Sequence, residues 1–342
     1  MASRFGLSDR MFVGPAARRL AATLERELEE VEEALARELQ SADPLVDAMS
    51  RYLYEAGGKR VRPMLVLLTA HLGEGMTDAV RDTAVALELM HLGSLYHDDV
   101  MDGADRRRGV TAAHRVWDNS TAILIGDLLL SRASRVMGRH GDIAVDMQTE
   151  TFERLVMGQL NETVGPRDGD DPIAFYLQVL ADKTGSLIAA AAQAGAHFGG
   201  AAEEHRDALR AYGEKVGVAF QLADDVIDLS ADPEKTGKVP GTDLRAGVVT
   251  MPYLLLKDSA DPADVDLAGR IDAGVERIRE GADPAILDGE LEELRDHAAT
   301  ARTHELALRW TSEAVDALAP LPRGTVREAL TRFARELADR SR

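Results

Sequence analysis

Two aspartate-rich segments with the same internal spacing are the part of this sequence best suited to do chemistry. One reads DDVMD and the other DDVID, and the carboxylates they supply are Asp98, Asp99 and Asp102, then Asp224, Asp225 and Asp228. In a helix, the first and fifth residues of such a segment share one face and the second lies beside it. Three carboxylates this close repel one another and so favour a bound cation. Oxygen ligands of this kind suit Mg²⁺, which commonly bridges carboxylates to substrate phosphates.

A single segment of this kind is more often a solvated acidic helix end, because charged residues mostly lie at protein surfaces. Both segments here, however, follow strongly apolar stretches. Leu92 and Leu95 precede the first, and Phe220 and Leu222 precede the second. Two apolar helices that end in the same triad favour a pair of equivalent metal-binding carboxylate groups over two solvated ends.

Two basic clusters stand out because the chain as a whole is acidic, with a formal net charge of −19. The segment GGKRVRP places three cations after the pair Gly57 and Gly58, and RRRG closely follows the first aspartate segment. The first cluster alone is equally well explained as a solvated basic turn. Arginines suit phosphate oxygens because they can bind them with two parallel hydrogen bonds. Together with carboxylate-bound metal, they indicate a diphosphate site.

The segments that must position these residues have the pattern of amphipathic helices. Aromatic residues make up only 4% of the chain, and strand-like alternation is rare. Leucines and Val31 recur at three- and four-residue spacing between Leu20 and Leu35, which is typical of a helix with one buried face. Similar patterns extend over Asp82–Tyr96, Thr121–Met137, Asp146–Thr163, Phe175–Ala196, Glu204–Asp228 and Pro284–Leu318. Short glycine- and proline-containing turns separate them. We expect one all-α domain over residues 1–342.

Composition excludes several other classes of function. The chain has no cysteine, so disulfides and thiolate metal sites are excluded. Its negative charge makes nucleic acid an unsuitable partner. Apolar stretches are interrupted by charges such as Asp127 before they reach the length of a membrane span. The N-terminus has no pattern of a secretory signal, so a cytoplasmic protein is expected.

With these residues in view, the chain resembles the trans-isoprenyl diphosphate synthase (polyprenyl synthetase) family. The resemblance rests on six segments in the family order, found between about residues 56 and 252. They read GGKRVRP, HLGSLYHDDVMDGADRRRG, GDLLLSRA, KTGSL, GVAFQLADDVIDL and GKVPGTDLRAG. The resemblance implies a single-domain helical bundle of the isoprenoid synthase type around a central active-site cavity, and a homodimer. The implied reaction joins isopentenyl diphosphate to an allylic diphosphate primer by ionisation, condensation and loss of a proton.

Carried over residue by residue, the resemblance assigns the site. The six aspartates would bind three Mg²⁺ ions against the allylic diphosphate. That diphosphate would also contact Arg107, Lys183 and Lys238. Isopentenyl diphosphate would bind, without metal, to Lys59, Arg62, His91 and Arg108. The reacting carbons would lie near Thr184 and Gln221, and the cavity wall would include Gln159 and Glu162.

Some of these residues have simpler explanations. A lone helical histidine such as His91 is more often a satisfied core residue, and Lys183 could cap a helix. Asp127, although part of a family segment, is better explained as a structural hydrogen-bond acceptor and is left out of the site. Val248 stands where many relatives carry lysine, which removes one cation near the allylic diphosphate.

Two small residues bear on product length. Relatives that make short products place bulky aromatic residues four and five positions before the first aspartate of the first segment. This chain has Ser94 and Gly93 there. We therefore expect an open product tunnel and a long product, from hexaprenyl to decaprenyl.

Other functions are less favoured by the sequence. A synthase of the farnesyl or geranylgeranyl type would need a tunnel floor on another helix. A class I terpene cyclase would normally lack the second aspartate segment and the isopentenyl diphosphate pocket. A non-catalytic partner subunit of a synthase would usually have degraded aspartate segments, whereas these are intact.

Overall fold

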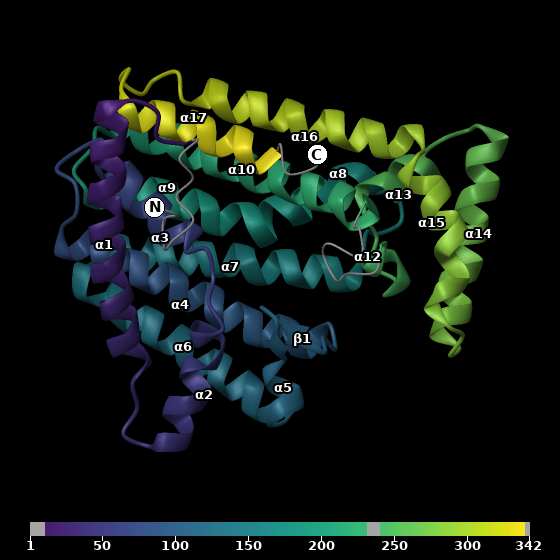
Figure 1. The fold of residues 1–342 in the computed structure, drawn as a ribbon, viewed down its shortest axis with the longest axis horizontal. Coiled ribbons are helices and arrows are strands. Elements are labelled where there is room, and N and C mark those ends of the chain that lie inside the picture. The colour runs from purple at the N-terminus through teal and green to yellow at the C-terminus, as the bar shows by residue number, and fades with distance from the viewer. Residues whose placement is uncertain (1–10, 231–239, 339–342) are drawn as a thin grey trace. The chain divides into compact units, whose positions relative to one another are not determined.

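Helices form nearly all of the regular structure in the computed structural model, which describes residues 11–230 and 240–338 (Figure 1). Strands within these residues are limited to β1 (Arg106–Arg107) and β2 (Val110–Thr111), which pair antiparallel. The prediction of an all-α fold is confirmed. The short hairpin was not predicted and lies in the basic segment that follows the first aspartates.

Contacts between Cα atoms divide the chain into two compact units, which are described separately below. The first unit consists of Met1–Val156, Ser186–Gly213 and Ala317–Arg332. The second consists of Met157–Gly185, Glu214–Asp316 and Phe333–Arg342. Long helices contribute residues to both units, namely α7 (Asp142–Val164), α10 (Glu203–Ser230), α16 (Ala298–Ala317) and α17 (Thr325–Ala338). That residues 1–342 form a single domain stays a prediction.

The other helices belong to one unit each. Those of the first are α1 (Pro15–Leu39), α2 (Pro44–Glu55), α3 (Val61–Ala70), α4 (Asp78–Met101), α5 (Ala113–Val116), α6 (Asn119–Met137), the 3₁₀ turn η1 (Gly138–His140) and α9 (Ser186–Phe198). Those of the second are α8 (Pro172–Leu180), the π-helical turn η2 (Ala181–Gly185), α12 (Thr242–Arg245), α13 (Met251–Lys257), α14 (Pro262–Arg279), the 3₁₀ turn η3 (Pro284–Leu287) and α15 (Asp288–Arg295).

Several helical segments begin with an aspartate followed by proline. The aspartate side chain accepts hydrogen bonds from backbone N–H groups of the first turn, which have no partner inside the helix. Proline suits the first helical position because it has no N–H to satisfy and its φ is already helical. These pairs are Asp43-Pro44 at α2, Asp171-Pro172 at α8, Asp261-Pro262 at α14 and Asp283-Pro284 at η3.

The core of the first unit forms where α4 packs along α6 and α3 packs along α9. Residues Leu65 to Leu68 of α3 are fully buried. Gly195 of α9 lies so close to α3 that a Cβ there would come within 2.0 Å of the Val66 carbonyl oxygen. The α3–α9 spacing therefore depends on a glycine, because any side chain would have to push the two backbones apart.

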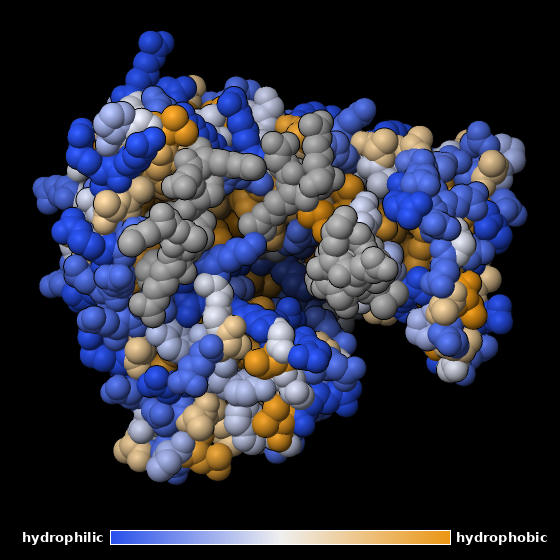
Figure 2. Space-filling view, viewed as in Figure 1, coloured by the Kyte–Doolittle hydropathy of each residue, from blue (hydrophilic) through white to orange (hydrophobic). Residues whose placement is uncertain are grey.

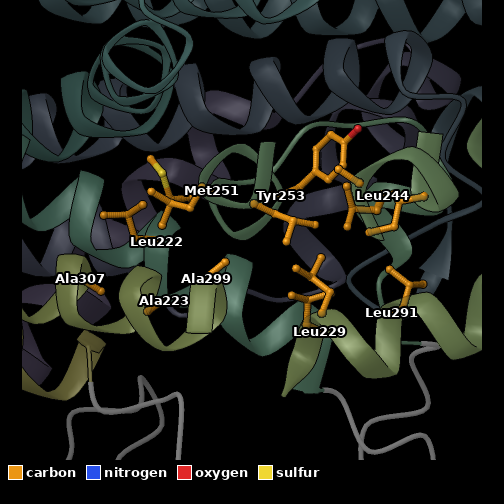
Figure 3. Close-up of a cluster of buried hydrophobic side chains, with 14 of the residues drawn as sticks. Leu222, Ala223, Leu229, Leu244, Met251, Tyr253, Leu291, Ala299 and Ala307 are labelled. Atoms are coloured by element: carbon orange, nitrogen blue, oxygen red, sulfur yellow. The ribbon is translucent and has the colours of Figure 1, made fainter. Parts of the chain in front are cut away.

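The second unit has its own cluster of buried hydrophobic side chains (Figure 3). Leu222, Ala223 and Leu229 of α10 contribute to it from either side of the second aspartate segment. Residues from other helices complete it, among them Leu244, Met251, Tyr253, Leu291, Ala299 and Ala307. Because α10 is buried along this face, the direction of its carboxylates is fixed by the packing.

Two of the predicted helices are interrupted. The pattern from Pro284 to Leu318 predicted one helix, but α15 ends before His297 and α16 begins at Ala298. The His297 ring accepts a hydrogen bond from the Ala299 N–H at 3.1 Å and contacts Asp264 at 3.0 Å, so it caps the second helix. The pattern from Phe175 to Ala196 is broken by η2.

The face drawn in Figure 2 is mostly hydrophilic, with hydrophobic residues scattered over it. None of the helices in the described part of the chain combines the length and the apolarity needed to cross a bilayer.

We expect Gly195→Ala to destabilise the first unit, because the added methyl group would collide with the α3 backbone. Overpacking of this kind costs about 1–3 kcal/mol of unfolding free energy. Denaturant unfolding followed by circular dichroism measures the loss. Gly269→Ala on exposed α14 is the control, since no atom lies within 4 Å of a Cβ there. That variant should be neutral or slightly stabilising. An unchanged unfolding midpoint for Gly195→Ala would contradict the close crossing.

Candidate active site

The first aspartate segment lies in the last turn of α4, and its three carboxylates differ in exposure. Asp98 is half-buried and Asp102, the C-terminal cap of α4, is exposed. Asp99 is fully buried. Its Oδ1 accepts a hydrogen bond from Arg107 Nε at 2.7 Å, while its buried Oδ2 accepts none. Burial raises the pKa of Asp99 above its ordinary value, although the nearby Arg107 lowers it.

The hairpin of β1 and β2 places the arginines that follow. Arg106 pairs with Thr111 and Arg107 with Val110, so the connecting loop is Arg108-Gly109. Both loop residues have positive φ, 51° and 81°. Two such residues make the tight turn that matches the twist of a hairpin, but positive φ is unusual for a residue other than glycine. Arg108 is thus held in a strained conformation beside the first carboxylate group.

Arg108 is fixed by backbone oxygens of α2 and of the loop that follows it. Its Nη1 donates to the Leu53 carbonyl oxygen at 2.9 Å and to the Gly57 carbonyl oxygen. The guanidinium also packs against Gly58, where a Cβ would lie 3.0 Å from Arg108 Cζ and 2.6 Å from Arg60 Nη1. The second glycine of GGKRVRP is therefore needed for space as well as for its φ of 148°.

Arg60, in the middle of this basic segment, is a structural residue. It is buried, and its guanidinium bonds to Glu32 at 2.5 Å and to Glu88 at 3.3 Å. Two carboxylates therefore neutralise this cation. The sequence could not reveal the pairing, because Glu32 and Glu88 are both far from Arg60 along the chain.

Arg62 has a different environment. Its Nε is buried and has no hydrogen-bond partner. The pKa of Arg62 is lowered to about 10, chiefly by burial; Glu88 opposes the shift and Arg108 adds to it. An anion is the partner that would satisfy such a group.

His91 on α4 lies in the field of the same cations. Burial lowers its pKa well below the ordinary value, and the charges of Arg62 and Arg108 add to the effect. His91 is therefore neutral at physiological pH. Lys59, the remaining predicted residue of this group, is exposed. In the first unit, Arg62, Arg107 and Arg108 thus lie near His91, and Arg107 bonds to Asp99. That Lys59, Arg62, His91 and Arg108 bind isopentenyl diphosphate stays a prediction.

The second aspartate segment repeats the pattern of the first. Asp224 and Asp228 are half-buried, whereas Asp225 is 5% exposed. Both Asp225 oxygens accept from the Tyr176 hydroxyl, at 3.1 and 2.9 Å, and Oδ2 also accepts from the Met251 N–H at 3.0 Å. Burial raises the pKa of Asp225 to about 8, although both of these hydrogen bonds lower it.

The residues after this segment are fixed to Asp228. Its Oδ2 accepts from the Asp243 N–H at 3.3 Å, and its carbonyl oxygen accepts from the Gly241 N–H at 2.8 Å. Lys238, predicted to contact the allylic diphosphate, lies outside the described residues. Val248 is 43% exposed, and its N–H donates to the Asp243 carbonyl oxygen.

Lys183 and Thr184 lie in the π-helical turn η2 of the second unit, and both are half-buried. The Lys183 ammonium donates to Glu162 of α7. Gln159, half-buried on the same helix, has a buried Oε1 without a hydrogen-bond partner. Gln221 is half-buried on α10, one turn before Asp225. Four residues predicted to lie in the site therefore belong to the second unit, namely Gln159, Lys183, Thr184 and Gln221.

The two residues assigned to product length have unequal surroundings. Gly93 is buried at the crossing of α4 and α6, where a Cβ would lie 3.1 Å from the Gly126 carbonyl oxygen and 3.2 Å from Leu130 Cγ. The expectation that Gly93 leaves open space is corrected, because α6 fills it. Ser94 is half-buried, and its hydroxyl donates to the His91 carbonyl oxygen at 2.9 Å.

The donor set suits a hard divalent cation. In the described ranges, no three His, Asp or Glu side chains gather closely enough to hold a metal ion. In each aspartate segment, the first and fifth carboxylates nevertheless share one helical face and are half-buried or exposed. Mg²⁺ is commonly bound by one or two carboxylates together with water and phosphate oxygens.

Sequence reasoning missed residues that hold the site in place. Tyr176 and the Met251 N–H fix Asp225, and Glu32 and Glu88 fix Arg60. No motif or periodicity signals such partners. Asp127, which we left out, has a 59% exposed side chain and contacts His97 at 3.3 Å.

Comparison with known proteins gives one consistent family. The polyprenyl synthetase family model matches residues 43–279. The nonaprenyl diphosphate synthase of Mycobacterium tuberculosis is 39% identical over 91% of both chains. A polyprenyl synthase from Caulobacter crescentus, solved with calcium and isoprenyl diphosphate, is 32% identical with a TM-score of 0.85, over 95% of this chain and 98% of the other.

A geranylgeranyl pyrophosphate synthase from Corynebacterium glutamicum, also solved with calcium and isoprenyl diphosphate, is 39% identical with a TM-score of 0.82. The alignment covers 96% of this chain and 98% of that one. The family model spans both aspartate segments, and the relatives are similar over nearly the whole chain. With these carboxylates and cations in place, the chain belongs to the polyprenyl synthetase family.

Proposed function

We propose that this prenyltransferase is a trans-polyprenyl diphosphate synthase that depends on Mg²⁺ and makes a long-chain product, from hexaprenyl to decaprenyl. The observation that carries the proposal is the shared design of the two aspartate segments. In each, the second carboxylate is buried and hydrogen-bonded within its own unit, whereas the first and fifth are half-buried or exposed. Two such groups are suited to hold metal ions against one diphosphate.

The resemblance assigned six carboxylates to the metal ions, and we propose that four of them bind directly, namely Asp98, Asp102, Asp224 and Asp228. Asp99 and Asp225, which are buried and hydrogen-bonded, would instead keep the two groups in position. We propose three Mg²⁺ ions, as the family resemblance implies. The calcium named for two structural relatives supports a divalent cation. Bound Mg²⁺ would neutralise the charge that develops on the departing diphosphate.

The cationic group of the first unit would bind isopentenyl diphosphate without metal. Arg62, with its unsatisfied Nε, would bind the diphosphate together with Lys59 and Arg108. Neutral His91 would donate one hydrogen bond without adding charge. The allylic diphosphate would contact Arg107, Lys183 and Lys238, with Thr184 and Gln221 close to the reacting carbons.

The reaction begins when the allylic carbon–oxygen bond breaks and its electron pair leaves on the diphosphate. The double bond of isopentenyl diphosphate then supplies the electrons of the new carbon–carbon bond. A proton leaves the product cation and restores a double bond, and the released diphosphate accepts that proton. Lys183 and Arg107 would stabilise the developing negative charge, and buried apolar helices would exclude the water that quenches the cation.

We further propose that one catalytic domain spans both compact units and that two copies form a homodimer. The family match, residues 43–279, includes parts of both units. On α6, Ile123 and Leu124 are 42% and 65% exposed, which is an apolar surface suited to a second copy. The cytoplasmic location and the absence of a nucleic-acid partner stay predictions.

A geranylgeranyl synthase is the second candidate. It is favoured by the 39% identical relative of that activity and by the close packing of α6 against Gly93. The deciding experiment incubates purified protein, Mg²⁺ and radiolabelled isopentenyl diphosphate with farnesyl or geranylgeranyl diphosphate. A single long polyprenol after dephosphorylation supports the proposal. A C₂₀ product supports the second candidate, and no product with either primer contradicts both.

Ser94→Tyr should shorten the product, because it places an aromatic ring at a half-buried position four residues before Asp98. Chromatography of the dephosphorylated products measures the change. Gly93→Tyr should instead mainly lower stability, since its Cβ meets α6. Ser134→Tyr, an exposed position on α6, is the control. An unchanged product length for Ser94→Tyr would contradict a product tunnel that runs along this part of α4.

Substitution of Arg60 should mainly lower stability, whereas substitution of Arg62 should mainly weaken substrate binding. Arg60→Gln removes a buried cation from two carboxylates and should lower the unfolding free energy by about 3–5 kcal/mol. Arg62→Gln removes a ligand and should raise the KM for isopentenyl diphosphate by about 10- to 100-fold, which corresponds to one charged hydrogen bond. Steady-state kinetics and denaturant unfolding on both variants give the test. Equal effects on stability and equal KM values would contradict these roles.

Asp98→Asn should weaken Mg²⁺ binding, whereas Asp99→Asn should lower the stability of the fold. The first should raise the Mg²⁺ concentration for half-maximal rate by at least about tenfold, the loss expected at a metal site. The second should leave that concentration nearly unchanged and lower the unfolding free energy by about 1–3 kcal/mol, because the buried Arg107 pair is weakened. A larger Mg²⁺ effect from Asp99→Asn would reverse the assignment.

A further inference from the structure

The turn η2 (Ala181–Gly185) is the one π-helical segment among the described residues, and it carries Lys183 and Thr184. A π-helical turn is wider than an α-helical one and is rare, so it needs support from its surroundings. Two other helices of the second unit, α7 and α10, contact its backbone directly.

On one side lies Gly158 of α7. A Cβ at this position would come within 2.5 Å of the Lys183 backbone nitrogen, and within 3.0 Å of Asp182 C and Lys183 Cα. These are backbone atoms, which cannot move aside as the end of a side chain could. Only glycine at 158 allows α7 to lie this close to the turn.

On the other side lies Gly217 of α10. A Cβ there would come within 2.5 Å of Gly185 Cα, 2.8 Å of Gly185 N and 3.3 Å of Thr184 C. Gly185 is equally close to α10, since its own Cβ would lie 3.1 Å from the Glu214 carbonyl oxygen. The end of the turn and α10 are therefore in contact backbone to backbone.

The helix that supports the Lys183 backbone also holds its side chain. Glu162 lies one turn after Gly158, hence on the same face of α7. Its carboxylate accepts from the Lys183 ammonium, and the two side chains are 25% and 32% exposed. A shift of the turn away from α7 would move the ammonium as well as the backbone.

We propose that Gly158 and Gly217 are positioning residues for the allylic substrate. Their missing side chains let α7 and α10 hold η2 from two sides, which fixes Lys183 and Thr184 relative to the allylic diphosphate. The inference rests on the proposed function of those two residues. It assigns the placement of part of the site to Gly158 and to Gly217, the first residue of the segment GVAFQLADDVIDL, neither of which was given a role above.

The test compares Gly158→Ala and Gly217→Ala with Gly213→Ala. Gly213 lies on α10 one turn before Gly217, and a Cβ there would come within 2.5 Å of Ala189 Cα. The control therefore makes an equally close backbone contact, away from η2. All three variants should lose stability. Only the first two should lower kcat/KM for the allylic primer, by about 100-fold, the cost of a misplacement near 1 Å, with KM for isopentenyl diphosphate unchanged.

Amide hydrogen exchange of residues 181–185 in the same proteins gives a readout that does not need activity. Exchange should be faster in Gly158→Ala and Gly217→Ala than in Gly213→Ala. Should the alanine variants at 158 and 217 fail to fold, Gly185→Ala, with a milder 3.1 Å contact, replaces them. Exchange of the turn equal to that of the control would overturn the inference. An inactive wild-type protein would instead overturn the proposed function, while the exchange result would still decide the role of the glycines.

Discussion

Charged groups taken out of water must find partners, and this constraint determines how the aspartate segment of each unit is held in place. Asp99 and Asp225 lie inside their units, where an unpaired carboxylate would be strongly destabilising. Asp99 is paired with Arg107, and that ion pair ties the β1–β2 hairpin to the end of α4. Asp225 accepts from the Met251 N–H, which ties the start of α13 to α10. In each unit, a buried carboxylate thus connects the helix that carries an aspartate segment to a neighbouring segment of the chain.

Close contacts between backbones are the second constraint. Where α3 crosses α9, and where α7 and α10 meet η2, glycine brings the main chains closer than any side chain would allow. Such contacts leave little freedom to slide, because interiors are packed as densely as crystals. The cations and carboxylates described above are therefore carried by elements that are fixed on several sides.

The sequence predicted the elements that repeat or alternate, and failed where a feature depends on distant partners. The spacing of the aspartates, the apolar stripes and the positions of the basic clusters all follow from local periodicity, and the helices on which they lie were found. The role of Arg60 was not, since its carboxylates come from α1 and α4. The break at His297 depends on a contact with Asp264, and the π turn on glycines in two other helices. We expected open tunnel space beside Gly93 because the sequence does not show which helix packs against it.

The contrast between Arg60 and Arg62 shows how one short basic segment can serve two purposes. The two residues are two positions apart, so they lie on different sides of the start of α3. Arg60 is neutralised by carboxylates and gains nothing from a further anion. Arg62 keeps a buried nitrogen without a partner and has its pKa lowered to about 10 by burial and by its cationic neighbour Arg108. An anion that entered would relieve the repulsion between these cations and satisfy the buried nitrogen. The free protein is thus less stable than it could be at the place where a diphosphate is proposed to bind. Binding would recover that free energy.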